Sequence, residues 1–573
     1  MADSGSQLDS ILTAIQAFID GRLQEIAEEE LALRDRVLRP ISKLKTGLLS
    51  RNSCHTAVQS SIQITLEGLQ DECSTQNIDS LLTFVRKLPL VLKTWPKDWL
   101  PYATLSILKW SDRSDDSQLA LMAEGVSDLA LTYSEETLLT CCRIATLCRM
   151  LAESNSISRW LAKGASFEHL GSGILKNVSN PDVRAAINEY ERRRPGSALF
   201  TDEGIFFDSS HPSISQFKSQ HLISLGMTAP PFDQFVLEPN HAEFPISYFP
   251  LPRNRVALAA LLRPYDDALQ DLFGVGTESI LEVLQAIGSL IIRSFLTSTE
   301  ENSWSFSGSL QNEGFNRRFL FMLGICRRGY LRFPEDHLRD EIARQLSKEY
   351  SGEALRAEET VNRFFGAFCR RAEHTKDIDV GRLEPLSILY VTAGNQCYLD
   401  LPWFDDFFRW LIIRSREWFS SQHGDRFTLA VKRLVEERSP HSKVVGWKKT
   451  YIGSSNEQVE ADLLIENDGI LSVVECKAHA KSRGFWLGEL PATRRRIQKI
   501  SEAVAQARRT TNTLAELLEG GHIPLRGIRT IEWVVCTPSQ EFLLPVDKFG
   551  YLSPGIPRVC TPEELINHFC RSK

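Results

Sequence analysis

The spacing of apolar residues changes at Gly424, and this change restricts the fold more than any other feature of the 573-residue sequence. Before that point apolar residues recur three and four positions apart, as in residues 23–37, which is typical of amphipathic helices. After it, residues 443–452 and 459–465 alternate as half-buried strands do, and residues 470–476 form a short apolar run. The sequence therefore predicts a mainly α N-terminal region and a C-terminal α/β domain.

The predicted order of elements after Gly424 defines the C-terminal domain. The elements are a helix over 425–437, strands over 443–452, 459–465 and 470–476, a helix over 492–519, a strand over 528–536 and a last helix over 562–569 that Thr561 caps. Without the last helix the order is α-β-β-β-α-β. We expect a mixed central sheet in a domain over 401–573, which begins with an aromatic-rich helix over 402–420.

Three further segments precede that domain. Residues 1–194 are predicted to form a helical domain, and residues 255–400 a second helical region. Between them, residues 195–254 contain 8 of the 25 prolines, a density that interrupts helices. This segment is either a linker or an irregular stretch packed on a neighbour, and its many aromatic residues favour packing.

Composition limits the class of protein. Hydrophobic residues make up 42% and charged residues 24%, which is typical of a globular chain and not of a disordered or disulfide-stapled one. The twelve cysteines form no CxxC pair, and the start MADSGSQLDS does not resemble a signal peptide. The apolar stretch 280–296 is too polar to span a bilayer. We expect a cytoplasmic protein with no membrane partner.

Charge is divided unevenly along the chain, whose formal net charge is −7. Residues 401–573 hold 25 Lys and Arg against 21 Asp and Glu, so the excess of acid lies in residues 1–400. The basic balance of the C-terminal part permits local contact with nucleic acid.

The hairpin over 459–479 carries the chemistry that we predict. Glu475 and Lys477 lie two residues apart at the end of its second strand and so share a face, and Asp462 lies in its first strand two residues after Glu460. The turn therefore brings Asp462, Glu475 and Lys477 together. Two carboxylates can hold Mg²⁺ or Mn²⁺, and a neighbouring lysine can orient an attacking water. Surface ion pairs are the alternative, but charges at the end of a buried strand favour catalysis.

These residues resemble the PD-(D/E)XK nuclease superfamily, the restriction-endonuclease-like fold, in its Mrr-, NERD- and RecB-like branches. The resemblance covers roughly residues 424–570 and consists of Asp462, twelve intervening residues, Glu475-Cys476-Lys477 and the order of elements. It implies that Asp462, Glu475 and Glu460 bind the metal and that Lys477 assists the water.

The resemblance also implies roles for residues on the two helices. Gln506 matches a glutamine that some members carry on the helix after the hairpin. On the first helix Thr428 stands where related proteins carry an acid, and Glu436 or Glu437 can substitute for it.

Basic residues near the hairpin are the candidates for nucleic-acid contacts, because Lys and Arg neutralise phosphates. They are Arg494, Arg495, Arg496, Lys499, Lys481 and Arg483. His479, two residues after Lys477, either contacts substrate or is an ordinary surface histidine.

We therefore predict a metal-dependent endonuclease that hydrolyses phosphodiester bonds, with DNA as the expected substrate. The helical part has no catalytic motif, and we expect it to bind a regulatory protein or to form a homo-oligomer, in the manner of a bacterial anti-phage defence effector. Two alternatives stay open. One is an RNA-cutting or DNA-repair nuclease, and the other is an inactive nuclease fold that acts as a nucleic-acid-binding scaffold.

Overall fold

The computed structural model describes most of the chain outside the proline-rich segment. The described residues are 21–76, 81, 99–111, 135–193, 262–296, 330–371, 378–382, 389–391, 396–400, 410–411, 414–415, 418, 424–453, 456–479, 481–523, 527–544 and 549–571. The predicted segment 195–254 and most of the aromatic helix over 402–420 lie outside them. No helix in the described ranges has both the length and the apolar character that crossing a membrane requires.

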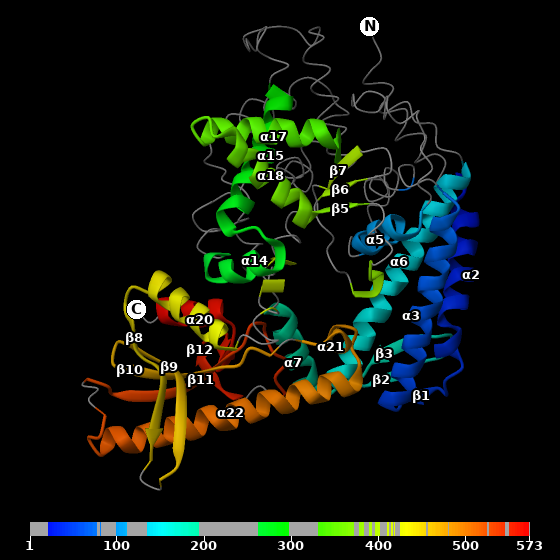
Figure 1. The fold of residues 1–573 in the computed structure, drawn as a ribbon. Helices are drawn as coiled ribbons and strands as arrows, with labels where there is room; N and C mark the ends of the chain where they lie inside the picture. Colours follow the sequence, from blue (N-terminus) through cyan, green and yellow to red (C-terminus); the bar gives the residue numbers. More distant parts are fainter. Residues whose placement is uncertain are drawn as a thin grey trace, which may run out of the picture.

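The N-terminal region is a group of long helices, as predicted (Figure 1). Its elements are α2 (Leu23–Ser42), α3 (Arg51–Ser74), α5 (Leu100–Trp110), α6 (Glu135–Ala162) and α7 (Pro181–Arg192), with a small antiparallel sheet of β1 (Gly47–Leu48), β2 (Phe167–His169) and β3 (Leu175–Asn177). Helix α3 packs along α6 and is capped by Ser50, whose side chain accepts a hydrogen bond from the backbone N–H of Ser53 at 3.2 Å.

The second region is helical but also contains a four-stranded sheet, which the prediction of a helical region does not include. Its helices are η5 (Arg263–Tyr265), α14 (Asp266–Phe273), α15 (Thr277–Leu296), α17 (Glu335–Glu349), α18 (Ala354–Phe368) and η8 (Val380–Arg382). Strands β4 (Tyr330–Pro334), β5 (Cys369–Arg371), β6 (Leu389–Val391) and β7 (Gln396–Asp400) form the sheet in the order β4-β7-β6-β5. Strands of three to five residues are too short for alternation to distinguish them from loops.

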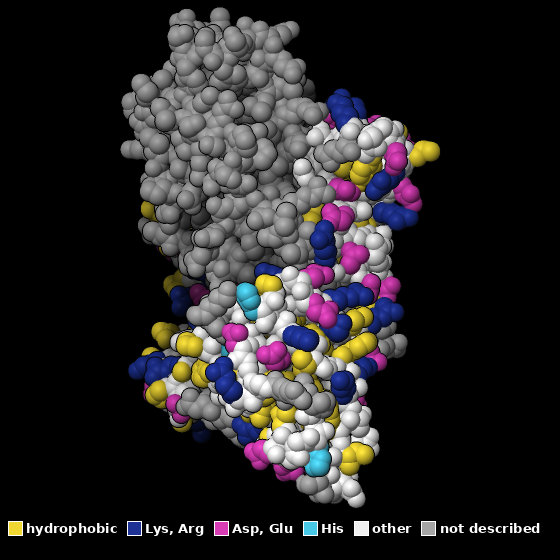
Figure 2. Space-filling model, turned by 90° about the vertical axis from the view of Figure 1, so that its left-hand side faces the viewer, with side chains coloured by type: hydrophobic (Ala, Val, Ile, Leu, Met, Phe, Trp, Pro, Cys, Tyr) yellow, Lys and Arg dark blue, Asp and Glu magenta, His cyan; other side chains and the backbone are white. Residues whose placement is uncertain are grey.

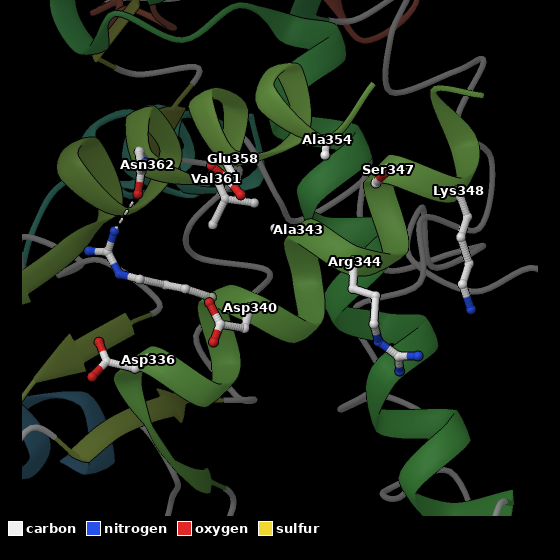
Figure 3. A pocket seen from close by; sticks show the side chains of 11 residues that line it. Asp336, Asp340, Ala343, Arg344, Ser347, Lys348, Ala354, Glu358, Val361 and Asn362 are labelled. Atoms are coloured by element: carbon white, nitrogen blue, oxygen red, sulfur yellow. Dashed lines mark hydrogen bonds between the residues drawn. The ribbon is translucent and has the colours of Figure 1, made fainter. Parts of the chain in front are cut away.

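A groove of about 680 Å³ lies between α17 and α18 (Figure 3). Side chains of both signs line it, among them Asp340, Arg344 and Glu358, and Arg339 donates a hydrogen bond to Asn362 Oδ1 at 2.9 Å. Its walls therefore favour no ligand of one particular charge.

The C-terminal region contains a mixed five-stranded sheet. Its elements are α20 (Gly424–Arg438), β8 (Ser442–Ile452), β9 (Gln458–Asn467), β10 (Ile470–Cys476), α21 (Arg483–Trp486), α22 (Leu490–Glu519), β11 (Thr530–Cys536), β12 (Tyr551–Ser553), β13 (Ile556–Pro557), β14 (Val559–Cys560) and α24 (Pro562–Arg571). The strand order is β14-β11-β10-β9-β8. Strands β10, β11 and β14 run parallel to one another, and β9 runs antiparallel to both of its neighbours, β10 and β8. The predicted order of elements is confirmed, and β14 adds a fifth strand.

Helices cover both faces of this sheet. Apolar residues of α20 and α24, such as Val431 and Ile566, pack with Val474 and Val534 on one face. Residues of α22, such as Ala507, pack on the other face. Helix α22 continues past the sheet toward the N-terminal helices and contacts α6 (Figure 1).

The N-terminal helices also contact the turn before α22. The Nε2–H of His55 donates to the carbonyl of Gly488 at 2.8 Å, and Ser158 Oγ donates to the carbonyl of Leu487 at 3.1 Å. Gly488 has φ +76°, and a Cβ there would lie 2.7 Å from the backbone nitrogen of Arg159. Only glycine allows the turn to approach α6 so closely.

Candidate active site

The hairpin of β9 and β10 places Asp462 beside Glu475. Its turn contains Asp468 and Gly469 at φ +49° and +79°, the two positive values that a type I′ turn requires. The ladder pairs residues as far as Leu463 with Val474, so Asp462 and Glu475 occupy the next position on each strand. The backbone N–H of Cys476 donates to Asp462 Oδ2 at 2.8 Å and fixes that carboxylate at the end of the ladder.

Lys477 completes the predicted group of three. Its Nζ lies 2.6 Å from Glu475 Oε1, and its backbone N–H donates to the carbonyl of Cys536 on β11 at 2.9 Å. The side chain of Glu475 is only 3% exposed, whereas that of Lys477 is 24% exposed. The lysine therefore joins a buried carboxylate to the surface.

Burial dominates the electrostatics of the two carboxyl groups. It raises the pKa of Glu475 to about 7, and the charges of Asp462 and Glu460 add to the rise although Lys477 opposes it. Burial also raises the pKa of Asp462, against the Cys476 N–H and the charge of Lys477. The protein supplies less positive charge here than the two carboxylates need, a deficit that a divalent cation would remove.

Glu460 lies at the edge of this group. It is exposed on β9 and pairs with Thr450 of β8, and its charge acts on both central carboxylates. No set of three His, Cys, Asp or Glu side chains in the described part of the chain is arranged to hold a metal. The donor set that is present, the buried carboxylate of Glu475 beside the partly exposed carboxylate of Asp462, suits Mg²⁺, which keeps several of its waters.

Lys448 and Asp425 also belong to this end of the sheet, although we did not predict them as site residues. Lys448 lies between the pairs Trp447–Leu463 and Lys449–Ala461, and thus opposite Asp462. It has φ +48°, forms an ion pair with Asp425 and lowers the pKa of Asp462. In the sequence of β8 the alternation of apolar and polar residues breaks at Lys448, and this break is the only local signal of its position.

Glu436 and Glu437, the two glutamates proposed as site residues on the first helix, do not lie at this end of the sheet. Glu436 is eleven residues beyond Asp425, about 17 Å along α20 at the helical rise of ~1.5 Å per residue, and forms an ion pair with Lys432 at 3.0 Å. Glu437 is exposed and interacts with Arg263. The acid of α20 that approaches the hairpin is Asp425.

Gln506 lies in the part of α22 that covers the Glu475 side of the sheet. Glu475 is in register with Val535 of β11, and Val535 packs against Ala503 and Ala507 on either side of Gln506. The Gln506 side chain is half-buried. Gln506 therefore lies on the same face of the sheet as Glu475, but among the described residues it forms no hydrogen bond with the three central groups.

Four of the six basic candidates are exposed and two are not. Arg494, Arg495 and Lys499 are exposed on α22, and Arg483 is exposed but forms an ion pair with Asp379 at 2.7 Å. Lys and Arg are mixed with Asp and Glu over the face seen in Figure 2. Arg494, Arg495 and Lys499, which no ion pair given above engages, stay candidates for phosphate contacts.

The prediction that Arg496 and Lys481 bind nucleic acid is wrong. Arg496 is buried against Glu541, with Nε 3.0 Å from Oε2, and donates to the carbonyl of His479 at 2.8 Å. Lys481 is buried and donates to the carbonyl of Gln540 and to Tyr190 Oη. Both cations have their partners inside the protein, as a buried charge requires, and so do not face a phosphate backbone.

His479 lies next to this buried pair. Burial lowers its pKa, and the charges of Arg496, Lys499 and Lys477 lower it further. The imidazole is therefore neutral at pH 7 and lies close to the charge of Lys477.

Comparisons with known proteins provide no relative: neither family models, nor curated proteins, nor solved structures match this chain.

Proposed function

We propose that the C-terminal region is a metal-dependent nuclease with a restriction-endonuclease-like fold of the PD-(D/E)XK type. The observation that carries the proposal is the buried pair of carboxylates, Asp462 and Glu475, with Lys477 in contact with Glu475 at 2.6 Å. The mixed sheet and the α-β-β-β-α-β order of elements support the fold.

Each residue has a role that follows from its chemistry. Asp462 and Glu475 would hold Mg²⁺ or Mn²⁺, with Glu460 as a further candidate ligand. When bound, the ion would supply positive charge to the phosphoryl oxygens. Lys477, held by Glu475, donates hydrogen bonds and so orients the attacking water and stabilises developing charge.

DNA is the substrate that we propose, with Arg494, Arg495 and Lys499 as phosphate contacts. These exposed residues lie on α22, the helix that covers the Glu475 side of the sheet. We extend the proposal to a cytoplasmic effector of antiviral defence that is controlled through its helical region. That extension rests on the chain's architecture alone.

The test is cleavage by the full-length, metal-stripped protein. Supercoiled DNA, linear DNA and single-stranded RNA are incubated with and without Mg²⁺ or Mn²⁺, using the wild type, Asp462→Asn and Lys477→Met. Glu436→Gln is the matched control, because Glu436 is an exposed carboxylate of the same domain.

Metal-dependent cutting that both site variants lose and the control retains would support the proposal, and the substrate that is cut distinguishes DNA from RNA. Equal cutting by all four proteins would refute the site. Metal-independent binding without cutting, unchanged in Asp462→Asn, would favour the scaffold alternative.

A further inference from the structure

The connection after β10 begins with the proposed catalytic lysine and is not held by regular secondary structure. In it, Lys477 pairs with β11 through one backbone hydrogen bond, and the N–H of His479 donates back to the carbonyl of Lys477 at 2.9 Å. We call residues 477–479 and Lys481 the Lys477 connection. The position of Lys477 therefore depends on the side chains that hold this connection in place.

The first anchor of the Lys477 connection is Lys481. Its buried Nζ lies 3.3 Å from Tyr190 Oη and donates to the carbonyl of Gln540. The rings of Tyr190, Phe485 and Trp486 surround it, with centroids 5.1, 5.2 and 5.2 Å away. Cation–π contacts that are shielded from water stabilise the ammonium group of Lys481 in this position. Tyr190 belongs to α7, so the N-terminal region supplies part of this anchor.

The second anchor is a chain of buried charges that also ends beside α7. Arg496 donates to the carbonyl of His479 at 2.8 Å and pairs with the side chain of Glu541. The carbonyl of Glu541 in turn accepts a hydrogen bond from Arg193 Nη1 at 3.4 Å. Arg193, which caps α7, is buried and bound by Glu564 at 2.7 Å and by the carbonyl of Val559 at 2.9 Å.

We propose that Tyr190 and Arg193 are positioning residues for Lys477. The C-terminal end of α7 holds the Lys477 connection through two hydrogen-bonded routes, one by way of Lys481 and one by way of Glu541, Arg496 and His479. The Lys477 connection is thus held by a helix that is distant in the sequence, since 291 residues separate Tyr190 from Lys481. This inference rests on the proposed function for its kinetic consequences and on packing alone for its structural ones.

The experiment compares hydrogen exchange and kinetics in the full-length protein. The variants are Tyr190→Phe, which removes one hydroxyl and keeps the ring, and Arg193→Gln, which removes the charge. Arg184→Gln, an exposed position on the same helix, is the matched control. Amide exchange is measured for residues 477–479 and, as an internal reference, for β9 and β10.

We expect faster exchange at residues 477–479 in both variants, with β9 and β10 unchanged. Because misplacement of a catalytic group by about 1 Å can cost about 100-fold, we expect kcat to fall about tenfold or more in Arg193→Gln and about threefold in Tyr190→Phe, with KM within about twofold of wild type. The control should match wild type.

Exchange that stays at the wild-type rate in both variants would overturn the proposal. So would an equal rise over the whole sheet in both variants, because that is general unfolding and not loss of positioning. If wild type cuts no substrate with any metal, the proposed function fails, and the exchange measurement still decides whether α7 holds the Lys477 connection.

Discussion

Two carboxylates that are equally hidden from solvent, Glu475 and Glu541, lie in different electrostatic surroundings. Their side chains are 3% and 1% exposed. Glu541 faces the guanidinium of Arg496, and although burial alone would lower the pKa of Arg496, the charge and hydrogen bond of Glu541 raise it. Glu475 has one half-exposed lysine and a second carboxylate beside it, and its pKa is raised to about 7.

The comparison separates a structural ion pair from a site. Burial of a charge is common to both places, so burial does not indicate function. What suggests a functional site is negative charge that the surrounding protein does not neutralise. The Asp462–Glu475 pair still needs positive charge, whereas Glu541 is neutralised by Arg496. Four predictions test this difference, in order of decreasing effect.

Replacing Lys477 should lower cleavage strongly and change the free energy of unfolding little. In Lys477→Met we expect metal-dependent cleavage to fall about 10²- to 10⁴-fold, because the proposed function gives Lys477 the role of orienting water and stabilising charge. The free energy of unfolding should change by about 1 kcal/mol or less near pH 7, because Lys477 is 24% exposed and Glu475, whose pKa is about 7, can take up a proton when the lysine is lost. Cleavage rates and urea denaturation measure the two effects.

The matched control for that variant is Lys432→Met, because Lys432 is 26% exposed and pairs with Glu436 at 3.0 Å. Similar losses of cleavage in both variants would contradict the assignment of Lys477.

Replacing Arg496, which also holds the Lys477 connection through the carbonyl of His479, should act strongly on stability. Arg496→Met leaves Glu541 buried without its partner, so we expect the free energy of unfolding to fall by about 3–5 kcal/mol. In the double variant Arg496→Met/Glu541→Leu most of that loss should be recovered. A single variant that unfolds at the same urea concentration as wild type would show that the pair is not a structural one.

Neutralising Glu475 should stabilise the metal-free protein above neutral pH. The pKa of Glu475 rises from its ordinary 4.5 to about 7 on folding, so between these values the folded state binds more protons than the unfolded state. The free energy of unfolding therefore decreases as pH rises through that window. At about pH 8 we expect Glu475→Gln to be more stable than wild type by about 1–3 kcal/mol, and at about pH 4 to be equal to it.

Thermal unfolding in chelator at the two pH values is the measurement. If Asp462 and Glu475 hold Mg²⁺ as proposed, the ion should stabilise wild type more than the variant, which keeps only one of these two carboxylates. Stabilisation by Glu475→Gln that is independent of pH would argue against a raised pKa.

Removing one exposed cation should have the smallest effect. For Arg494→Ala we expect binding to DNA to weaken severalfold and the slope of log affinity against log salt to decrease by about one. Arg344→Ala is a control on α17, well away from α22 (Figure 1). An unchanged salt slope would remove Arg494 from the proposed interface.

The sequence predicts the sheet well because its strands differ clearly from its helices. Apolar alternation and the Asp468–Gly469 turn determine β8, β9 and β10, and with them the meeting of Asp462 and Glu475. Strand β14 has two residues, too few for any pattern. Helix α3 has little apolar contrast, because its buried residues include Ser61 and Thr65, and Thr65 Oγ1 donates to the carbonyl of Ser61 at 2.8 Å.

The misassigned cations show a different limit. In the run Arg494-Arg495-Arg496 the three residues are identical in type, and only packing against Glu541 distinguishes the third from the others. Such a contact joins residues 45 positions apart, and nothing local to the run predicts it. Asp425 escaped notice for the same reason, since its partner Lys448 is on another element.

The long reach of the Arg193 contacts has a consequence for how the protein is made. Arg193 emerges from the ribosome 348 residues before Glu541 and 371 residues before Glu564. At about 5–20 residues per second this is a delay of roughly 20–70 s, during which Arg193 lacks these two partners. The N-terminal helices therefore fold first and wait for the sheet. The Lys477 connection is fixed only after both glutamates have been synthesised, so the nascent chain has no assembled site while most of it is being translated.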